Sequence, residues 1–130
     1  MNVNTGGVMK KILLLGLIFL SIISNAGYGV MVLDVEKWTP GSAWNGDSYE
    51  EMTKIAMKYC KSKGGVNCKV IVKFEDECST LSYSKDEKVY GTSVGMIRVN
   101  SINNSLLECK NNGGTGCKVI IHACTLDISY

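Results

Sequence analysis

The sequence predicts an α+β fold, in which a duplicated strand-helix-strand unit forms a mainly antiparallel sheet with two helices on one face, stabilised by disulfides. A thirteen-residue phrase that begins at Cys60 recurs 49 residues later at Cys109, with eight identical positions and no gap. A helical pattern precedes each copy, and a β-branched, mostly apolar run follows it. The chain also holds six cysteines. Two copies indicate one small domain built from two internal repeats, at about residues 27–78 and 79–130.

The first segment, residues 1–26, is a predicted signal peptide. Two lysines precede an apolar run at residues 12–23, and small residues suited to cleavage follow it. The run is shorter than the roughly 18 residues that a membrane-spanning helix needs, so we expect cleavage rather than a retained anchor. Met9 is an alternative start to Met1. The expected product, residues 27–130, is exported to the periplasm or secreted, and has no membrane association after cleavage.

In the first repeat we expect a strand at residues 30–35, a long loop, and then a helix. Ser48 opens a capping box, and an apolar stripe from Met52 to Tyr59 has the spacing of an amphipathic helix. Two adjacent glycines, at 64 and 65, end the helix because glycine readily adopts the positive φ of a helix terminus. A strand at residues 69–74 follows.

The second repeat has the same order of elements. A strand is expected at residues 81–84, a helix at about 100–110, and a strand at 118–122. Glycines 113 and 114 repeat the helix stop.

The six cysteines predict three disulfides, because an exported chain meets an oxidising compartment. Zinc is the alternative, but its structural sites usually contain close Cys-x2-Cys pairs, whereas the gaps here are longer. Within a repeat, a strand separates the second cysteine from the third by over about 20 Å, too far for a bond. The first and third cysteines should lie at opposite ends of a helix–strand pair. The favoured pairs are Cys60–Cys68 and Cys109–Cys117, with Cys78–Cys124 joining the two repeats.

The charge balance argues against nucleic-acid binding. Loss of the signal peptide leaves 12 basic and 12 acidic side chains, and Arg98 is the only arginine. Nucleic-acid binding needs a clustered positive surface, and the sequence contains no such cluster.

The paired Cys-x7-Cys segments with internal Gly-Gly, each after a helix that ends in small and apolar residues, resemble a bacterial family known as domain of unknown function 4189. The resemblance covers roughly residues 41–124. It implies a small exported bacterial protein, and it brings no established activity, cofactor or catalytic residue. The chain departs from the family's Ala-rich helices at Asn103 and Asn104.

His122 is the only histidine. A catalytic histidine needs a nucleophile and an orienting group, and the sequence nominates neither, so a packed or edge histidine is the favoured interpretation. The Gly-Gly segments do not fit a phosphate-binding loop, because there a helix follows the glycines rather than preceding them. We predict no metal site and no cofactor.

The most aromatic stretch is the expected long loop before the first helix. Core packing is the default for tryptophan, but loops on a rigid scaffold often carry recognition. Trp38 and Trp44, with Tyr90 in the corresponding part of the second repeat, are therefore the candidates for a partner-binding surface.

The leading functional hypothesis is a non-enzymatic, exported protein that binds another protein, such as a periplasmic inhibitor or immunity protein. One alternative is a secreted effector or virulence factor that acts on a host or competitor cell. The other alternative is a small enzyme that uses His122.

Overall fold

A computed structural model describes residues 27–125 of the chain. The predicted signal peptide, residues 1–26, lies outside these residues. Between residues 27 and 125 the chain forms, in order, β1 (Tyr28–Asp34), β2 (Thr39–Gly46), α2 (Tyr49–Ser62), β3 (Lys69–Glu75), β4 (Cys78–Ser84), β5 (Val89–Gly95), α3 (Arg98–Asn111) and β6 (Lys118–Cys124). No helix in this part of the chain is long and apolar enough to cross a bilayer.

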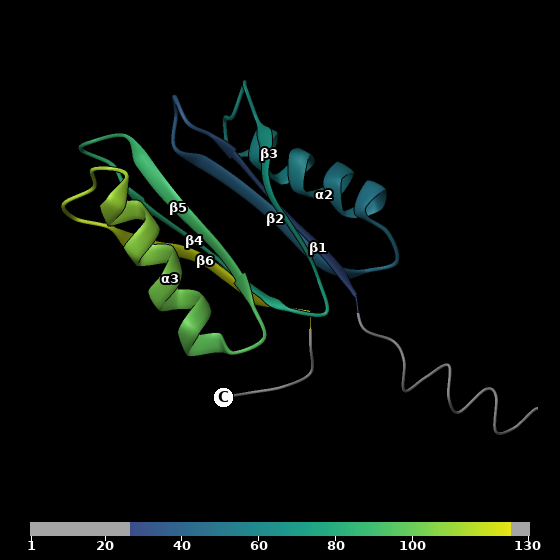
Figure 1. Cartoon of the computed structure of the whole chain (residues 1–130). Coiled ribbons are helices and arrows are strands. Elements are labelled where there is room, and N and C mark those ends of the chain that lie inside the picture. The colour runs from purple at the N-terminus through teal and green to yellow at the C-terminus, as the bar shows by residue number, and fades with distance from the viewer. Residues whose placement is uncertain (1–26, 126–130) are drawn as a thin grey trace, which may run out of the picture.

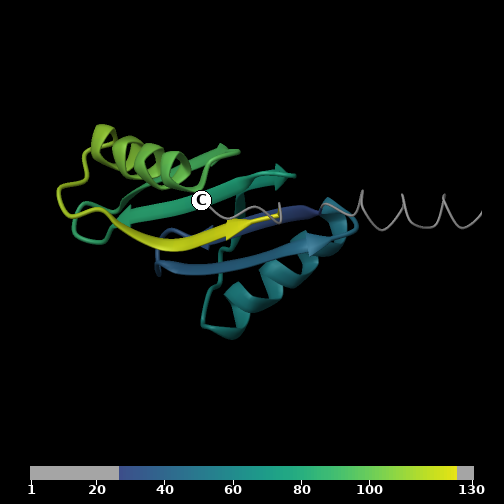
Figure 2. The ribbon, with the colours of Figure 1, turned by 90° about the horizontal axis from the view of Figure 1, so that it is seen from below.

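The predicted α+β class, the antiparallel pairing and the duplicated unit are confirmed. The strands form two three-stranded sheets, with strand orders β2-β1-β3 and β5-β4-β6, where the sequence predicted one main sheet with both helices on one face. The sheets pack face to face, and α2 and α3 cover the two outer faces (Figures 1 and 2). Each sheet consists of the three strands of one repeat. One face of each sheet packs against the helix of that repeat, and the other face packs against the second sheet.

Positions in the two repeats correspond closely. Gly41 of β2 lies opposite Val32, and Gly91 of β5 lies opposite Ser82, in the same place of each hairpin. A Cβ atom on either glycine would lie within 2.3 Å of a helical carbonyl oxygen. Glycine is therefore required at the point where each helix approaches its edge strand. The helices and strands on either side of this point also follow in the same order in both repeats.

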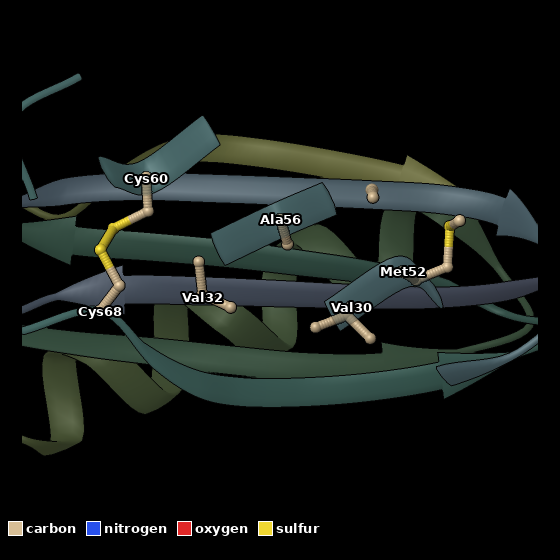
Figure 3. Close-up of a cluster of buried hydrophobic side chains, with 7 residues drawn as sticks. Val30, Val32, Met52, Ala56, Cys60 and Cys68 are labelled. Atoms are coloured by element: carbon tan, nitrogen blue, oxygen red, sulfur yellow. A yellow bond between two sulfur atoms is a disulfide. The ribbon is translucent and has the colours of Figure 1, made fainter. Parts of the chain in front are cut away.

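Two apolar layers stabilise the fold. Between α2 and the first sheet, Met52, Ala56 and Cys60 of the helix belong to one buried cluster with Val30 and Val32 of β1 (Figure 3). Between the two sheets, the buried side chains are Met31, Phe74, Leu81 and Ala123. Alternate residues of β1 thus serve the two layers, because successive side chains of a strand point to opposite faces.

The disulfides join Cys60 to Cys68, Cys109 to Cys117, and Cys78 to Cys124, which are the pairs that the sequence favours. The last pair does not join the two repeats as expected. Cys78 is the first residue of β4 and lies directly opposite Cys124 of β6, so this bond closes the second sheet on itself.

The repeated phrase forms a corner after each helix. Gly64 and Gly113 have φ values of 103° and 105°, which glycine adopts without strain. The next residue of each corner donates its amide to a carbonyl of the last helical turn, at 2.9 Å in the first repeat and 3.0 Å in the second. The glycines therefore stop the helices as the sequence predicts, and a disulfide ties each corner to the strand that follows.

An acidic side chain holds each corner in place. Asp34 accepts hydrogen bonds from the amides of Val66 and Asn67, at 2.8 and 2.9 Å, and these bonds lower the pKa of its carboxyl group. In the second repeat, Glu87 accepts from the amide and hydroxyl of Thr115, at 3.1 and 2.6 Å. Hydrogen bonds from the Ser84 hydroxyl and then from Thr115 lower the pKa of Glu87 to about 2.

Candidate functional site

The three aromatic candidates for partner binding lie in different places. Trp44 is in β2 with 41% of its surface exposed. Trp38 lies in the turn before β2, where its ring packs on that of Tyr83 at a centroid distance of 5.0 Å. Tyr90 is in β5 and packs against the layer between the sheets. Trp44 lines a groove between α2 and β2, and Tyr90 lines a groove of similar volume, about 440 Å³, between α3 and β5.

The segment predicted as a long loop is a β-hairpin whose second strand is β2. Its composition does not look like a strand, because it contains Pro40, Gly41 and Gly46. Proline and glycine are tolerated in β2 because it lies at the edge of its sheet. The loop expectation for Trp44 is therefore wrong.

An open groove of about 450 Å³ runs between α2 and β2. Ile55 and Tyr59 line it from the helix, Ser42 and Trp44 from the strand, and Lys63 at the end of the helix. Tyr59 has 53% of its surface exposed. The spacing of apolar residues placed Tyr59 on the buried stripe of the helix, and its place in the groove was not predicted. Residue spacing alone cannot distinguish a helical position above the core from one that extends past the edge of the sheet.

The two edge strands next to the helices differ in one respect. On β5, the Thr92 amide donates to the Glu108 carboxylate at 2.6 Å, and the Asn112 side-chain amide donates to the Tyr90 carbonyl at 2.8 Å. These backbone groups point away from the sheet, since their partners lie on α3 or just beyond its end. Side chains of the chain itself thus close the edge of β5.

On β2, the equivalent backbone groups are the Pro40 carbonyl and the Ser42 amide. The positions that correspond to Glu108 and Asn112 hold Tyr59 and Lys63. Across residues 27–125, no side chain forms a hydrogen bond with either backbone group. At these two backbone groups, the edge of β2 is therefore open where the edge of β5 is occupied by side chains.

His122 belongs to a second polar feature, a hydroxyl network under α3. Its Nδ1 atom lies 2.9 Å from the Thr80 hydroxyl, which in turn lies 2.8 Å from the Ser101 hydroxyl. A second group connects Ser105 with Ser82, whose hydroxyl oxygens are 2.9 Å apart. Hydrogen bonds thus replace apolar contacts between α3 and its sheet.

This network replaces the apolar layer of the first repeat position by position. The pairs, with the first-repeat residue first, are Val30 and Thr80, Val32 and Ser82, Ala43 and Ser93, Met52 and Ser101, and Ala56 and Ser105. The repeated phrase around the cysteines does not reveal this change, because these polar positions lie outside it. Comparison of the strands and helices at the same offset would have found it.

The two hydroxyl groups that connect to His122 are not open to a substrate. Thr80 is 0% exposed and Ser101 is 1% exposed, so neither hydroxyl is within reach of a reacting carbonyl. Burial, and secondarily the positive charge of Arg98, lower the pKa of His122. The imidazole lies within the network, with its Nε2 atom 3.7 Å from the Cys124 sulfur.

Comparison with known proteins places the whole described fold in one family. Residues 28–124 match the family model described as Domain of unknown function (DUF4189). Neither the curated proteins nor the solved structures contain a significant match to the chain. The matched region runs from β1 to the last residue of β6, and the chain therefore belongs to the DUF4189 family.

Proposed function

We propose that this protein is an exported binding module that captures an extended segment of a partner protein along the open edge of β2. The observation that carries the proposal is the difference between the two edge strands. Glu108 and Asn112 form hydrogen bonds with two outward-pointing backbone groups of β5, whereas no side chain among residues 27–125 does so with the same two groups of β2, which lie beside a groove lined by Trp44 and Tyr59.

An open strand edge is a template for another strand, because its unpaired N–H and C=O groups can continue the ladder. Many recognition domains bind extended peptides in this way, with main-chain hydrogen bonds that supply affinity and side-chain pockets that supply specificity. The Ser42 amide and the Pro40 carbonyl are the first partners that a bound segment would meet.

The groove supplies the side-chain specificity. Exposed tryptophan and tyrosine are the residues most often found as binding hot spots, and Trp44 and Tyr59 line the groove together with Ile55. In the second repeat, Val94 replaces Trp44, Asn104 replaces Ile55, and Glu108 replaces Tyr59. The groove chemistry is therefore particular to the first repeat, and it favours a segment that offers an apolar side chain.

Three disulfides suit an oxidising compartment, which supports export. A small, cross-linked receptor loses little conformational freedom on binding, and this preserves affinity. A periplasmic inhibitor or immunity protein is the form of this function that we favour. Recovery of the protein from the medium rather than from the envelope would favour a secreted effector.

The test uses the oxidised chain of residues 27–130 and a library of displayed peptides. We expect selected peptides to share an apolar position and to protect the amides of β2 from hydrogen exchange. Trp44→Ala should weaken binding at least roughly 30-fold, as expected for a hot-spot residue. Tyr59→Glu should abolish binding, because it introduces the carboxylate that closes the edge of β5.

Two controls separate binding from folding. Val94→Ala changes the second-repeat counterpart of Trp44 and should leave peptide affinity unchanged, and all variants should keep the melting temperature of the wild type within a few degrees. If selected peptides bind Trp44→Ala and Tyr59→Glu as tightly as the wild type, the groove is not the binding site and the proposal fails.

A further inference from the structure

We infer that Cys78, Cys124 and His122 form a redox-gated zinc site. In the oxidised protein the two sulfurs are bonded to each other, and the site is closed. Reduction of this one disulfide creates two thiols, which become thiolate ligands when zinc binds, next to an imidazole nitrogen that lies 3.7 Å from the Cys124 sulfur. This inference does not depend on the peptide-binding proposal.

The geometry places three ligand atoms together. Cys78 and Cys124 lie directly opposite each other on β4 and β6, and His122 precedes Cys124 by two residues, so it shares the same face of β6. The two sulfurs and the imidazole nitrogen lie within 4.8 Å of one another. Cys124 and His122 are half-buried, so a reductant and an ion can approach.

The separation of the atoms suits zinc. With Zn–S bonds of about 2.3 Å and Zn–N bonds of about 2.0–2.1 Å, a tetrahedral site holds its sulfur and nitrogen ligands roughly 3.5 Å apart. The Cys124 sulfur lies 3.7 Å from His122 Nε2. Little movement of the backbone is therefore needed once the sulfurs separate.

The hydroxyl network supplies the support that a zinc-binding histidine needs. Such a histidine almost always forms a hydrogen bond through its other ring nitrogen, which fixes the orientation of the ring. His122 Nδ1 lies 2.9 Å from the Thr80 hydroxyl, and Ser101 holds that hydroxyl in turn. This arrangement explains why the second repeat carries a threonine where the first carries Val30.

The first repeat has no such site. The positions that correspond to Cys78, His122 and Cys124 hold Tyr28, Lys73 and Glu75. The other two disulfides occupy the corners in both repeats, so they are structural counterparts of each other. The third disulfide is particular to the second repeat and is the one that has a histidine beside it.

The chemical step is a thiol–disulfide exchange. A dithiol of the oxidoreductase class transfers two electrons and two protons, so that the Cys78–Cys124 bond breaks and the reductant forms its own disulfide. Zn²⁺ then binds both sulfurs and neutral Nε2, and the two thiol protons are released. Three protein ligands leave the fourth zinc position for water. In the reverse exchange, the disulfide form of the same oxidoreductase accepts two electrons from the two thiolates, which restores the Cys78–Cys124 bond and releases the metal.

The test is a redox titration of the oxidised chain of residues 27–130, in buffered zinc and in chelator. Free thiols are alkylated and each cysteine pair is quantified by peptide mass spectrometry. We expect zinc to raise the dithiol-to-disulfide ratio of Cys78–Cys124 at least tenfold, which is about 30 mV for a two-electron couple. The pairs Cys60–Cys68 and Cys109–Cys117 are controls in the same sample and should not shift.

Two variants identify the ligands. His122→Ala should remove the zinc-dependent shift. Thr80→Val, which restores the residue type of the first repeat, should lower zinc affinity roughly 10–100-fold while the oxidised fold is retained. The inference is overturned if zinc produces no shift, or if the shift survives in His122→Ala. An equal shift at all three pairs would also overturn it, because it would mean that an unfolded chain holds the metal.

Discussion

The hydroxyl layer under α3 predicts strongly non-additive effects of mutation at Ser82 and Ser105. The Ser105 hydroxyl lies 2.9 Å from both the Ser82 hydroxyl and the Gly91 carbonyl, and Ser82 donates to the Ser105 carbonyl at 2.8 Å. Both serines are 0% exposed. Replacing one serine alone leaves buried polar groups without a partner, so Ser105→Ala should lower the free energy of unfolding by about 1–3 kcal/mol.

Ser82→Val alone should cost a similar amount, about 1–3 kcal/mol, because it adds volume next to a hydroxyl that has lost one partner. The double variant Ser82→Val, Ser105→Ala reproduces the pair formed by Val32 and Ala56 in the first repeat. It removes both polar groups together and buries additional hydrocarbon, at about 0.8 kcal/mol per methylene. We expect its stability to lie within about 1 kcal/mol of the wild type or above it.

The assay is urea unfolding of the oxidised wild type, the two single variants and the double variant, at pH 7. An unchanged dependence of unfolding free energy on urea would show that the unfolded states are comparable. The coupling energy between the two sites should be about 0.5–3 kcal/mol. If the double variant loses the sum of the two single losses, the hydroxyls do not act as a unit and the reasoning is refuted.

Three further predictions concern the corners, the helix contact and the histidine. Hydrogen bonds lower the pKa values of Asp34 and Glu87 in the folded state. The ionised carboxylates therefore stabilise the fold fully above about pH 5, and this stabilisation is lost as the pH falls from about 4 toward 2. In the double variant Asp34→Asn, Glu87→Gln, the melting temperature should decline less steeply over this acidic range. Gly41→Ala places a Cβ 2.2 Å from a helical carbonyl and should cost about 1–3 kcal/mol by urea unfolding, whereas Gly116→Ala enters open space and should change stability by less than about 0.5 kcal/mol. Burial lowers the pKa of His122 in the folded protein, so the unfolded chain binds a proton at a higher pH than the folded chain does. Stability should therefore fall as the pH drops below about 6.5, and His122→Gln should remove that decline. An unchanged decline in the variant would show that other groups cause it.

Part of the candidate site could be read from the sequence. Trp44 stands out as an aromatic residue in a stretch rich in glycine, and the sequence analysis named it for that reason. Its groove partners Ile55 and Tyr59 lie on the helical stripe, where spacing alone indicates core. Whether such a residue is buried or overhangs an edge depends on which strand lies beneath it, and the helix pattern does not contain that information.

Local sequence determined the elements whose causes lie within a few residues: the capped start of α2, the glycine stops at residues 64 and 113, and the β-branched runs of β3 and β6. It also favoured the three cysteine pairs, because chain reach and the helix–strand geometry argue against bonds between the third cysteine of a repeat and the other two. The tertiary structure decided the division into two sheets, the edge position of β2 and the contact between Thr80 and His122, which are 42 residues apart. These features are contacts between distant segments, so their energies depend on how whole sheets pack, and no window of neighbouring residues records that packing.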